Sequence, residues 1–148
     1  VVYLYLAASF FSFYFHQYPQ LYQKEWQYGY QELMTEIEQI NDEETPIYIS
    51  REWGRPVMYY WFFNQTEPTE VQVWNNLAKK DQGEYLEFNN LQFIDSIAQI
   101  ENNSGIVAAS QEKIESFMKQ HQKDSFQLIE EISTAQGEVL WQLYSFNY

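Results

Sequence analysis

The clearest periodic pattern in the chain lies between Pro19 and Ile40. Apolar side chains recur there in steps of three and four residues, and polar side chains fill most other positions. This spacing places the apolar residues on one face of a helix. The face consists of Tyr22, Trp26, Tyr30, Leu33, Ile37 and Ile40. The pattern therefore predicts one continuous amphipathic helix over 19–40, and the polar run before Pro46 ends it.

Short apolar runs bounded by polar loops predict the inner strands of a sheet. Ile47–Ser50 and Ile106–Ala109 are rich in β-branched or small apolar residues, the profile of buried strands. Pro56 suits the first turn of a helix, and the following residues 57–63 are apolar on all sides. We therefore expect a helix from Pro56 that is buried on most sides. Strand, short loop and helix in this order are typical of an α/β unit.

Two further segments predict antiparallel pairing. Asn89 and Asn90 tolerate positive φ and separate the apolar runs 85–88 and 91–94, which favours a tight hairpin. Near the end of the chain, the runs 126–132 and 139–146 surround a turn that contains Gly137. The second of these runs is apolar on both faces, so it is expected inside the sheet.

Helices are also expected over 71–78 and over 111–121. The second would begin after Ser110, which suits an N-cap, and would turn Ile114, Phe117, Met118 and His121 toward the core. At 148 residues the chain is sized for one domain. The sum of these elements is an α/β fold: a single domain with a mixed sheet of about five strands, helices packed on it and a C-terminal β-hairpin.

The first residues differ in character from the rest. Residues 1–15 carry no charge and are almost entirely apolar and aromatic. Two interpretations are open: a buried strand or helix of the domain, or the trailing end of a transmembrane helix whose aromatic end lies at the membrane surface. We expect residues 1–17 to be the end of a transmembrane helix or a membrane-proximal linker, and residues 18–148 to form the soluble domain.

Composition removes several classes of function. The chain has 8 Lys and Arg against 21 Asp and Glu, a formal net charge of −13. Such a surface repels phosphate backbones, so a nucleic-acid partner is excluded. The chain has no cysteine, which excludes disulfides, thiolate metal sites and a cysteine nucleophile. The scarcity of basic residues suits the extracytoplasmic side of a cell membrane.

Catalytic and cofactor motifs are absent from the sequence. Its 2 histidines, His16 and His121, stand far apart, and no phosphate-binding loop, nucleophile elbow or metal-binding helix motif occurs. We therefore expect no catalytic residue, no metal and no cofactor in this chain. The candidate ligand-binding residues are Arg51, Glu52 and Arg55, because loops after parallel strands form ligand crevices in α/β sheets. The plainer alternative pairs both arginines with nearby acids or turns them toward membrane phosphates.

Three stretches together resemble a known family. Phe15 to Pro19 reads F-H-Q-Y-P, Trp26 to Tyr30 reads W-Q-Y-G-Y, and Gly54 to Phe62 reads G-R-P-V-M-Y-Y-W-F. These runs are similar to the region after the last transmembrane helix in membrane glycosyltransferases of family 39, of the GT-C type. That family is similar to dolichyl-phosphate-mannose–protein mannosyltransferases. The similarity spans most of the chain and is loose between about Val71 and Asn103.

The resemblance implies a non-catalytic, extracytoplasmic C-terminal domain of an integral-membrane glycosyltransferase with a polyprenyl-phosphate sugar donor. Its partners would be the transmembrane catalytic part of the same longer chain, the membrane, and a carbohydrate or glycolipid. Gly29 and Gly54 match family positions and are expected to have structural roles. The alternative is a free-standing extracytoplasmic carbohydrate-binding or protein-interaction module, and an independent small enzyme is the least supported.

Overall fold

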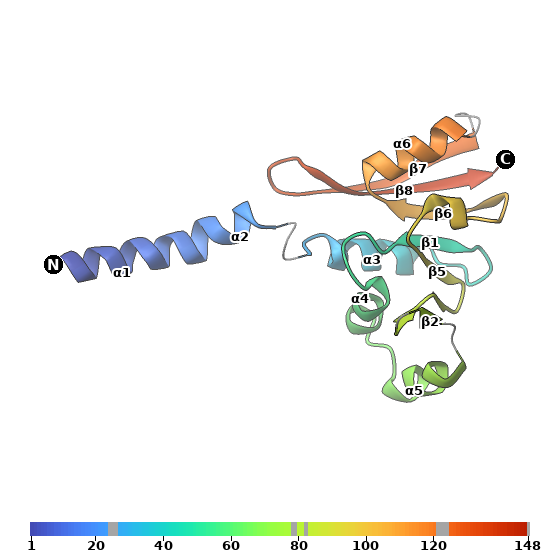
Figure 1. Cartoon of the computed structure of the whole chain (residues 1–148), viewed down its shortest axis with the longest axis horizontal. Helices are drawn as coiled ribbons and strands as arrows, with labels where there is room; N and C mark the ends of the chain where they lie inside the picture. The colour runs from blue at the N-terminus through green and yellow to red at the C-terminus, as the bar shows by residue number, and fades with distance from the viewer. Residues whose placement is uncertain (24–26, 78–79, 82, 121–124, 148) are drawn as a thin grey trace.

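In a computed structural model, the chain folds into an α/β body with a helical segment leading away from it (Figure 1). The structure describes residues 1–23, 27–77, 80–81, 83–120 and 125–147. The helices are α1 (Val2–Ser12), the π-helix η1 (Phe13–Gln17), α2 (Tyr18–Leu21), α3 (Tyr30–Ile40), α4 (Pro56–Phe63), α5 (Pro68–Leu77), the 3-10 helix η2 (Ile97–Gln99) and α6 (Gln111–Gln120). The strands are β1 (Ile47–Ser50), β2 (Lys80–Asp81), β3 (Glu84–Tyr85), β4 (Glu87–Phe88), β5 (Leu91–Ile94), β6 (Ser104–Ala109), β7 (Phe126–Ser133) and β8 (Val139–Asn147).

The main sheet has six strands in the order β4-β5-β1-β6-β8-β7. The central strand β1 runs parallel to both β5 and β6. Antiparallel pairs continue the sheet at both sides, β4 with β5 on one side and β6, β8 and β7 on the other. The short strands β2 and β3 form a separate two-stranded ribbon. All three parallel strands therefore end at the same edge of the sheet.

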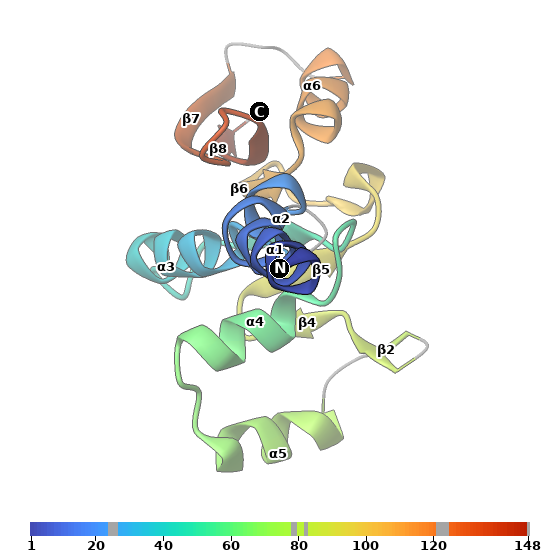
Figure 2. The ribbon, with the colours of Figure 1, turned by 90° about the vertical axis from the view of Figure 1, so that its left-hand side faces the viewer.

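Alternate side chains of β1 divide the core between the two faces of the sheet. Ile47 and Ile49 pack with α3 and α4 on one face. Tyr48 packs with Ile114 and Phe117 of α6 on the other. Figure 2 shows α3 and α6 on opposite sides of the sheet. The result is a three-layer body in which the central strands are covered on both faces.

The predicted fold class is confirmed: the chain forms an α/β body around a mixed sheet with a C-terminal hairpin. The main sheet has six strands, against a prediction of about five. The expected inner position of 139–146 is also confirmed. β8 lies between β6 and β7, and Leu140, Trp141 and Leu143 are fully buried.

The prediction of one helix over 19–40 is wrong. Helix α2 ends at Leu21, and α3 begins at Tyr30 after Gly29, which has a φ of +89°. Added at Gly29, a Cβ atom would lie 3.2 Å from Leu140 Cδ1 and 3.3 Å from Ile132 Cγ2. Glycine is therefore needed for the close approach to the sheet as well as for the backbone turn. Trp26, placed on the predicted helical face, lies outside the described residues.

Residues 2–21, formed by α1, η1 and α2, are called the N-terminal helical segment below. No residue of α1, η1 or α2 is buried. The π-helix η1 has a local cause. Pro19 has no amide hydrogen, and its ring crowds the preceding turn. The helix widens there, and the amide of Tyr18 donates to the carbonyl of Phe13, five residues earlier. Among the described residues, no helix combines the length and apolar character needed to cross a bilayer.

Two local predictions need correction. Helix α4 forms from Pro56 as expected, but Met58 and Phe62 are 51% and 74% exposed, so the helix is buried on one side only. The apolar run 85–88 divides into β3 and β4 at Leu86 rather than forming one strand. The hairpin turn at Asn89 is present, and its φ of +52° is the conformation that asparagine tolerates.

Candidate functional site

The candidate site lies where β5, β1 and β6 end. The loop after β1 carries Arg51, Glu52 and Arg55, as the sequence predicts, and the neighbouring strand ends supply Asp95 and Ser110. Beyond the β1 end the chain continues into α4 on one face of the sheet, and beyond the β6 end it continues into α6 on the other. Neighbouring strands whose connections part in this way form a ligand crevice in many open α/β sheets.

Arg51 is held by the end of the adjacent strand. Its Nε donates to Asp95 Oδ1 at 2.9 Å, and its Nη2 donates to Asp95 Oδ2 in a second, parallel bond. The Arg51 side chain is only 9% exposed. These hydrogen bonds, and then the guanidinium charge, hold the pKa of the Asp95 carboxyl below its usual range. Arg51 is therefore committed to an internal ion pair that links β1 to β5.

Glu52 reaches across the strand ends to the start of α6. Its carboxylate accepts hydrogen bonds from the backbone amide of Ser110 at 2.8 Å and from Ser110 Oγ at 3.0 Å. Lys113 Nζ lies 3.6 Å from the same carboxylate and donates to Ser50 Oγ at 2.8 Å. A helix N-terminus favours an anion because its amide groups point outward without partners. In this protein the chain's own glutamate occupies that place.

Arg55 and its surroundings form a shallow polar depression of about 440 Å³. Arg55 Nε lies 2.5 Å from Glu84 Oε1, and the Arg55 side chain is 65% exposed. The depression is lined by Arg51, Gly54, Arg55, Asp81, Glu84 and Asp95. With three carboxylates against two guanidinium groups, it does not present the net positive charge that an anionic ligand needs.

The structure thus brings Arg51 and Glu52 together at the end of the parallel strands and leaves Arg55 at the rim. Both arginines pair with acids, which is the plainer of the two alternatives that the sequence left open. Lys113 belongs to the same cluster and was not predicted. In the sequence, the only signal for Lys113 is its position in the first turn of the predicted helix that follows a buried strand.

Metal ligands do not gather in the described part of the chain. Within those residues, no group of three or more His, Cys, Asp or Glu side chains could hold a metal ion. His16 is exposed on the N-terminal helical segment, where its Nδ1 lies 3.2 Å from the carbonyl of Ser12. His121 lies outside the described residues.

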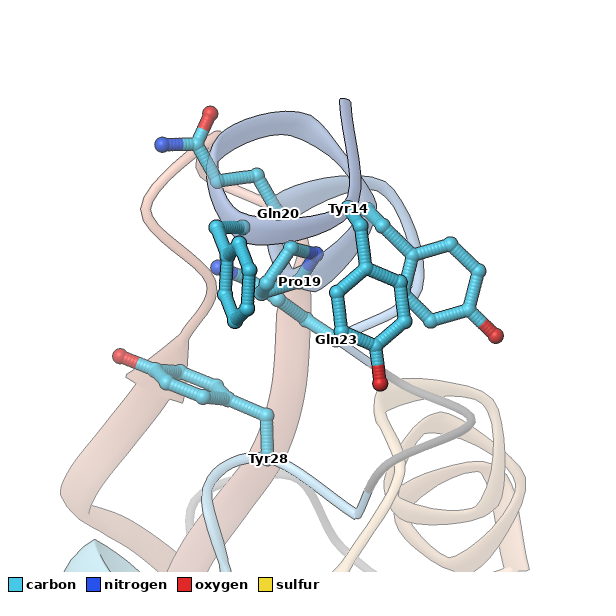
Figure 3. A pocket seen from close by; sticks show the side chains of 7 residues that line it. Tyr14, Pro19, Gln20, Gln23 and Tyr28 are labelled. Atoms are coloured by element: carbon cyan, nitrogen blue, oxygen red, sulfur yellow. The ribbon is translucent and has the colours of Figure 1, made fainter. Parts of the chain in front are cut away.

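A second cavity, which sequence reasoning missed, lies at the junction of the N-terminal helical segment and the body (Figure 3). We call it the neck pocket, and its volume is about 400 Å³. Its lining consists of Tyr14, Phe15, Tyr18, Pro19, Gln20, Gln23 and Tyr28. Figure 3 shows Tyr28 approaching from the segment before α3, opposite Pro19 and Tyr14 on the helical segment. Because the pocket depends on the break between α2 and α3, a continuous helix could not have predicted it.

Hydrogen bonds hold both walls of the neck pocket to the body, one of them at the turn of the C-terminal hairpin. Gln136 Nε2 donates a hydrogen bond to the carbonyl of Gln20 at 3.1 Å. On the other side, Gln27 Nε2 donates to the carbonyl of Trp53 at 3.2 Å. The end of the helical segment and the residues before α3 are therefore both tied to the body.

Comparison of the chain with protein-family models, with curated proteins and with solved structures finds no match. What the chain does is therefore inferred from its own residues, from the geometry above and from the resemblance of its three motif stretches.

Proposed function

We propose that this chain is a membrane-tethered, non-catalytic domain of an integral-membrane glycosyltransferase that takes its sugar from a polyprenyl-phosphate donor. The N-terminal helical segment lies in the membrane, and the α/β body stands on the extracytoplasmic side. The body acts on the enzyme or its acceptor by contact rather than by chemistry. The observation that carries this proposal is the exposure of the N-terminal helical segment.

This segment has no charged side chain, since the first Lys of the chain is Lys24. Its large apolar side chains are exposed on every side, with Leu4 at 76%, Phe10 at 59% and Phe15 at 65%. Soluble proteins rarely expose a contiguous apolar surface of this kind. A helix that is apolar on all sides suits surroundings that are apolar on all sides, which a bilayer provides and a one-sided groove does not.

The free energy favours insertion. Each large apolar side chain contributes about 1.5–3 kcal/mol when it leaves water, so several together contribute on the order of 10 kcal/mol. In water, by contrast, the 11-residue helix α1 would be only marginally stable on its own. Insertion would leave the aromatic end of the segment, from Phe13 to Tyr18, at the membrane surface, where tyrosine rings are favoured.

Support for the transferase context comes from two of the motif stretches that carry the resemblance. They are distant in sequence but touch in space, because Gln27 of the W-Q-Y-G-Y run bonds to the loop that contains Gly54. Support for a non-catalytic role comes from the candidate site, where the polar groups at the strand ends bind one another. Arg51 pairs with Asp95, and Glu52 binds the start of α6.

Two experiments test this proposal. The first is the sequence of the gene upstream of the codon for Val1, where we expect about eight or more hydrophobic spans of about 20 residues each. A cleavable signal peptide there would contradict the proposal and favour a free-standing module. The second incubates the chain in vesicles with a polyprenyl-phosphate sugar labelled in the sugar. We expect no hydrolysis or transfer, and turnover would contradict the proposal and place a catalytic site in this chain.

A further inference from the structure

The turn between β7 and β8 touches the N-terminal helical segment. Gln136 Nε2 of this turn donates to the carbonyl of Gln20 at 3.1 Å. Figure 1 shows the turn reaching from the body toward α2, whereas α5 and α6 lie farther along the long axis of the molecule. The hydrogen bond therefore places the turn at the level of Gln20 on the helical segment.

This level lies close to the membrane surface under the proposed function, on which the present inference rests. The aromatic end of the segment extends to Tyr18, two residues before Gln20 in helix α2. A helix advances about 1.5 Å per residue, so Gln20 lies about 3 Å beyond Tyr18 along the helix. The layer of lipid headgroups on each side of the hydrocarbon core is about 5–8 Å thick. Gln20 and the turn bonded to it therefore fall within that layer.

Tyr28 brings a second part of the body to the same level. It lies across the neck pocket from Pro19 and Tyr14 (Figure 3), and its side chain is 40% exposed. Tyrosine is favoured at the surface of a membrane, because its ring is apolar and its hydroxyl group stays hydrated. The body therefore meets the headgroup layer at two places that belong to different segments of the chain.

The turn is already ordered before it meets any partner. The buried Thr134 accepts hydrogen bonds at Oγ1 from the amides of Gln136 and Glu138, at 3.3 and 3.1 Å. The amide of Gly137 donates to the carbonyl of Thr134 at 2.9 Å. At the tip, the exposed residues Ala135, Gln136 and Gly137 carry no charge. Because these amides are bonded and the tip is neutral, the tip loses little hydration when it enters the headgroup layer.

From these contacts we infer that the turn at Ala135–Gly137 and the ring of Tyr28 rest among the headgroups of a zwitterionic lipid surface. Anionic headgroups would repel a chain with a formal net charge of −13, so the partner is a surface without net charge. With the helical segment as a third contact, the turn and Tyr28 prevent the body from rotating about the neck. One side of the body is thereby fixed toward the membrane.

The test measures the depth of single labels on the full chain in phosphatidylcholine vesicles. The chain has no cysteine, so each single-cysteine variant carries one bimane fluorophore. Nitroxide quenchers are placed either on the lipid headgroup or deep on the acyl chain. We expect the label at Ala135→Cys to lose most of its fluorescence to the headgroup nitroxide and little to the acyl-chain nitroxide. Tyr28→Cys should behave in the same way and provides a second, independent position.

Two control positions separate this inference from membrane insertion itself. Ser9→Cys lies within the apolar helix α1, and Gln72→Cys lies at an exposed position of α5. We expect the acyl-chain nitroxide to quench the label at Ser9→Cys and neither nitroxide to quench the label at Gln72→Cys. If the label at Ser9→Cys escapes quenching, the membrane placement fails and the inference fails with it.

The inference alone is overturned if the label at Ser9→Cys is quenched while the label at Ala135→Cys or at Tyr28→Cys behaves like the label at Gln72→Cys. Quenching of the label at Gln72→Cys by the headgroup nitroxide would also overturn the inference. The body would then rest on the membrane through α5 rather than through the turn and Tyr28.

Discussion

The side chain of Gln27 lies directly over Gly54. Its amide nitrogen donates to the carbonyl of Trp53 at 3.2 Å, and a Cβ atom added to Gly54 would lie only 2.8 Å from that nitrogen. Gly54 also has a φ of +134°, a conformation that other residues rarely adopt. Gly54 therefore permits both the turn after β1 and the hydrogen bond from Gln27 to the carbonyl of Trp53.

Substitution of Gly54 by alanine should destabilise the protein by about 1–3 kcal/mol, because the backbone is strained and the Gln27 amide is displaced. Denaturant unfolding measures the loss. Gly137→Ala is the matched control: Gly137 has a φ of +83° but no atom within 4 Å of the added Cβ. Its cost should reflect backbone strain alone. If Gly54→Ala costs the same with and without Gln27→Ala, the contact between these residues contributes nothing.

Glu52 is expected to act as a structural cap. Glu52→Ala removes the acceptor of the Ser110 amide and hydroxyl and leaves Lys113 without its carboxylate, so we expect a loss of about 1–2 kcal/mol. Thermal unfolding would measure it, with Glu112→Ala at an exposed position of α6 as the control. A stability change no larger than that of the control would mean that Glu52 is free for another role.

The pair of Arg51 and Asp95 should make stability depend on pH in the acid range. The native pKa of Asp95 is lowered, so its contribution is complete above the unfolded pKa of about 3.9 and is lost as pH falls through the native pKa. Urea unfolding of the wild type and of Asp95→Asn should therefore differ at neutral pH and converge in strong acid. Asp81→Asn, which removes an exposed aspartate, is the matched control for the loss of one carboxylate. A constant difference across the pH range would contradict this assignment.

Tyr60 should ionise late in alkali. Burial, together with its hydrogen bond to Glu38 at 2.8 Å, raises the pKa of Tyr60 to about 12. Its contribution to stability is complete below the unfolded pKa of about 10 and is lost as pH rises through about 12. Ultraviolet titration should show a late tyrosinate phase that is smaller in Tyr60→Phe. Tyr3→Phe, which removes an exposed tyrosine, is the matched control for the loss of one phenol. An unchanged late phase in Tyr60→Phe would refute the assignment.

The body of the fold was predictable where one local pattern determined one environment. The β-branched run at Ile47 could only be a buried strand, and the doubly apolar run at Leu140 could only lie inside the sheet. The break before α3 was not predictable in this way. The apolar spacing continues through Gly29, and only its contacts with Leu140 and Ile132 make a left-handed glycine necessary there. The exposure of Phe62 was missed because an apolar helix does not reveal which of its sides is covered.

The candidate site was predictable in place but not in composition. The parallel strand β1 placed Arg51 and Glu52 at a strand end, as expected from the order of strand, loop and helix. Their partners Asp95 and Ser110 come from strands 44 and 58 residues away, and no local pattern links them. The neck pocket was out of reach for the same reason, since it depends on how two separate segments meet.

Flotation of the full chain with neutral phosphatidylcholine vesicles tests most directly whether the N-terminal helical segment lies in a membrane. The chain has a net negative charge and the vesicles are neutral, so charge attraction does not draw the protein to them. Flotation would therefore report insertion of the apolar segment. The test variant carries Leu6→Arg and Phe10→Arg, which together oppose insertion by about 5 kcal/mol. The control places the same two charges on the body through Gln31→Arg and Gln72→Arg. We expect the wild type and the control to float and the test variant to remain at the bottom of the gradient. A wild type that stays at the bottom, or a test variant that floats equally well, would contradict the membrane placement.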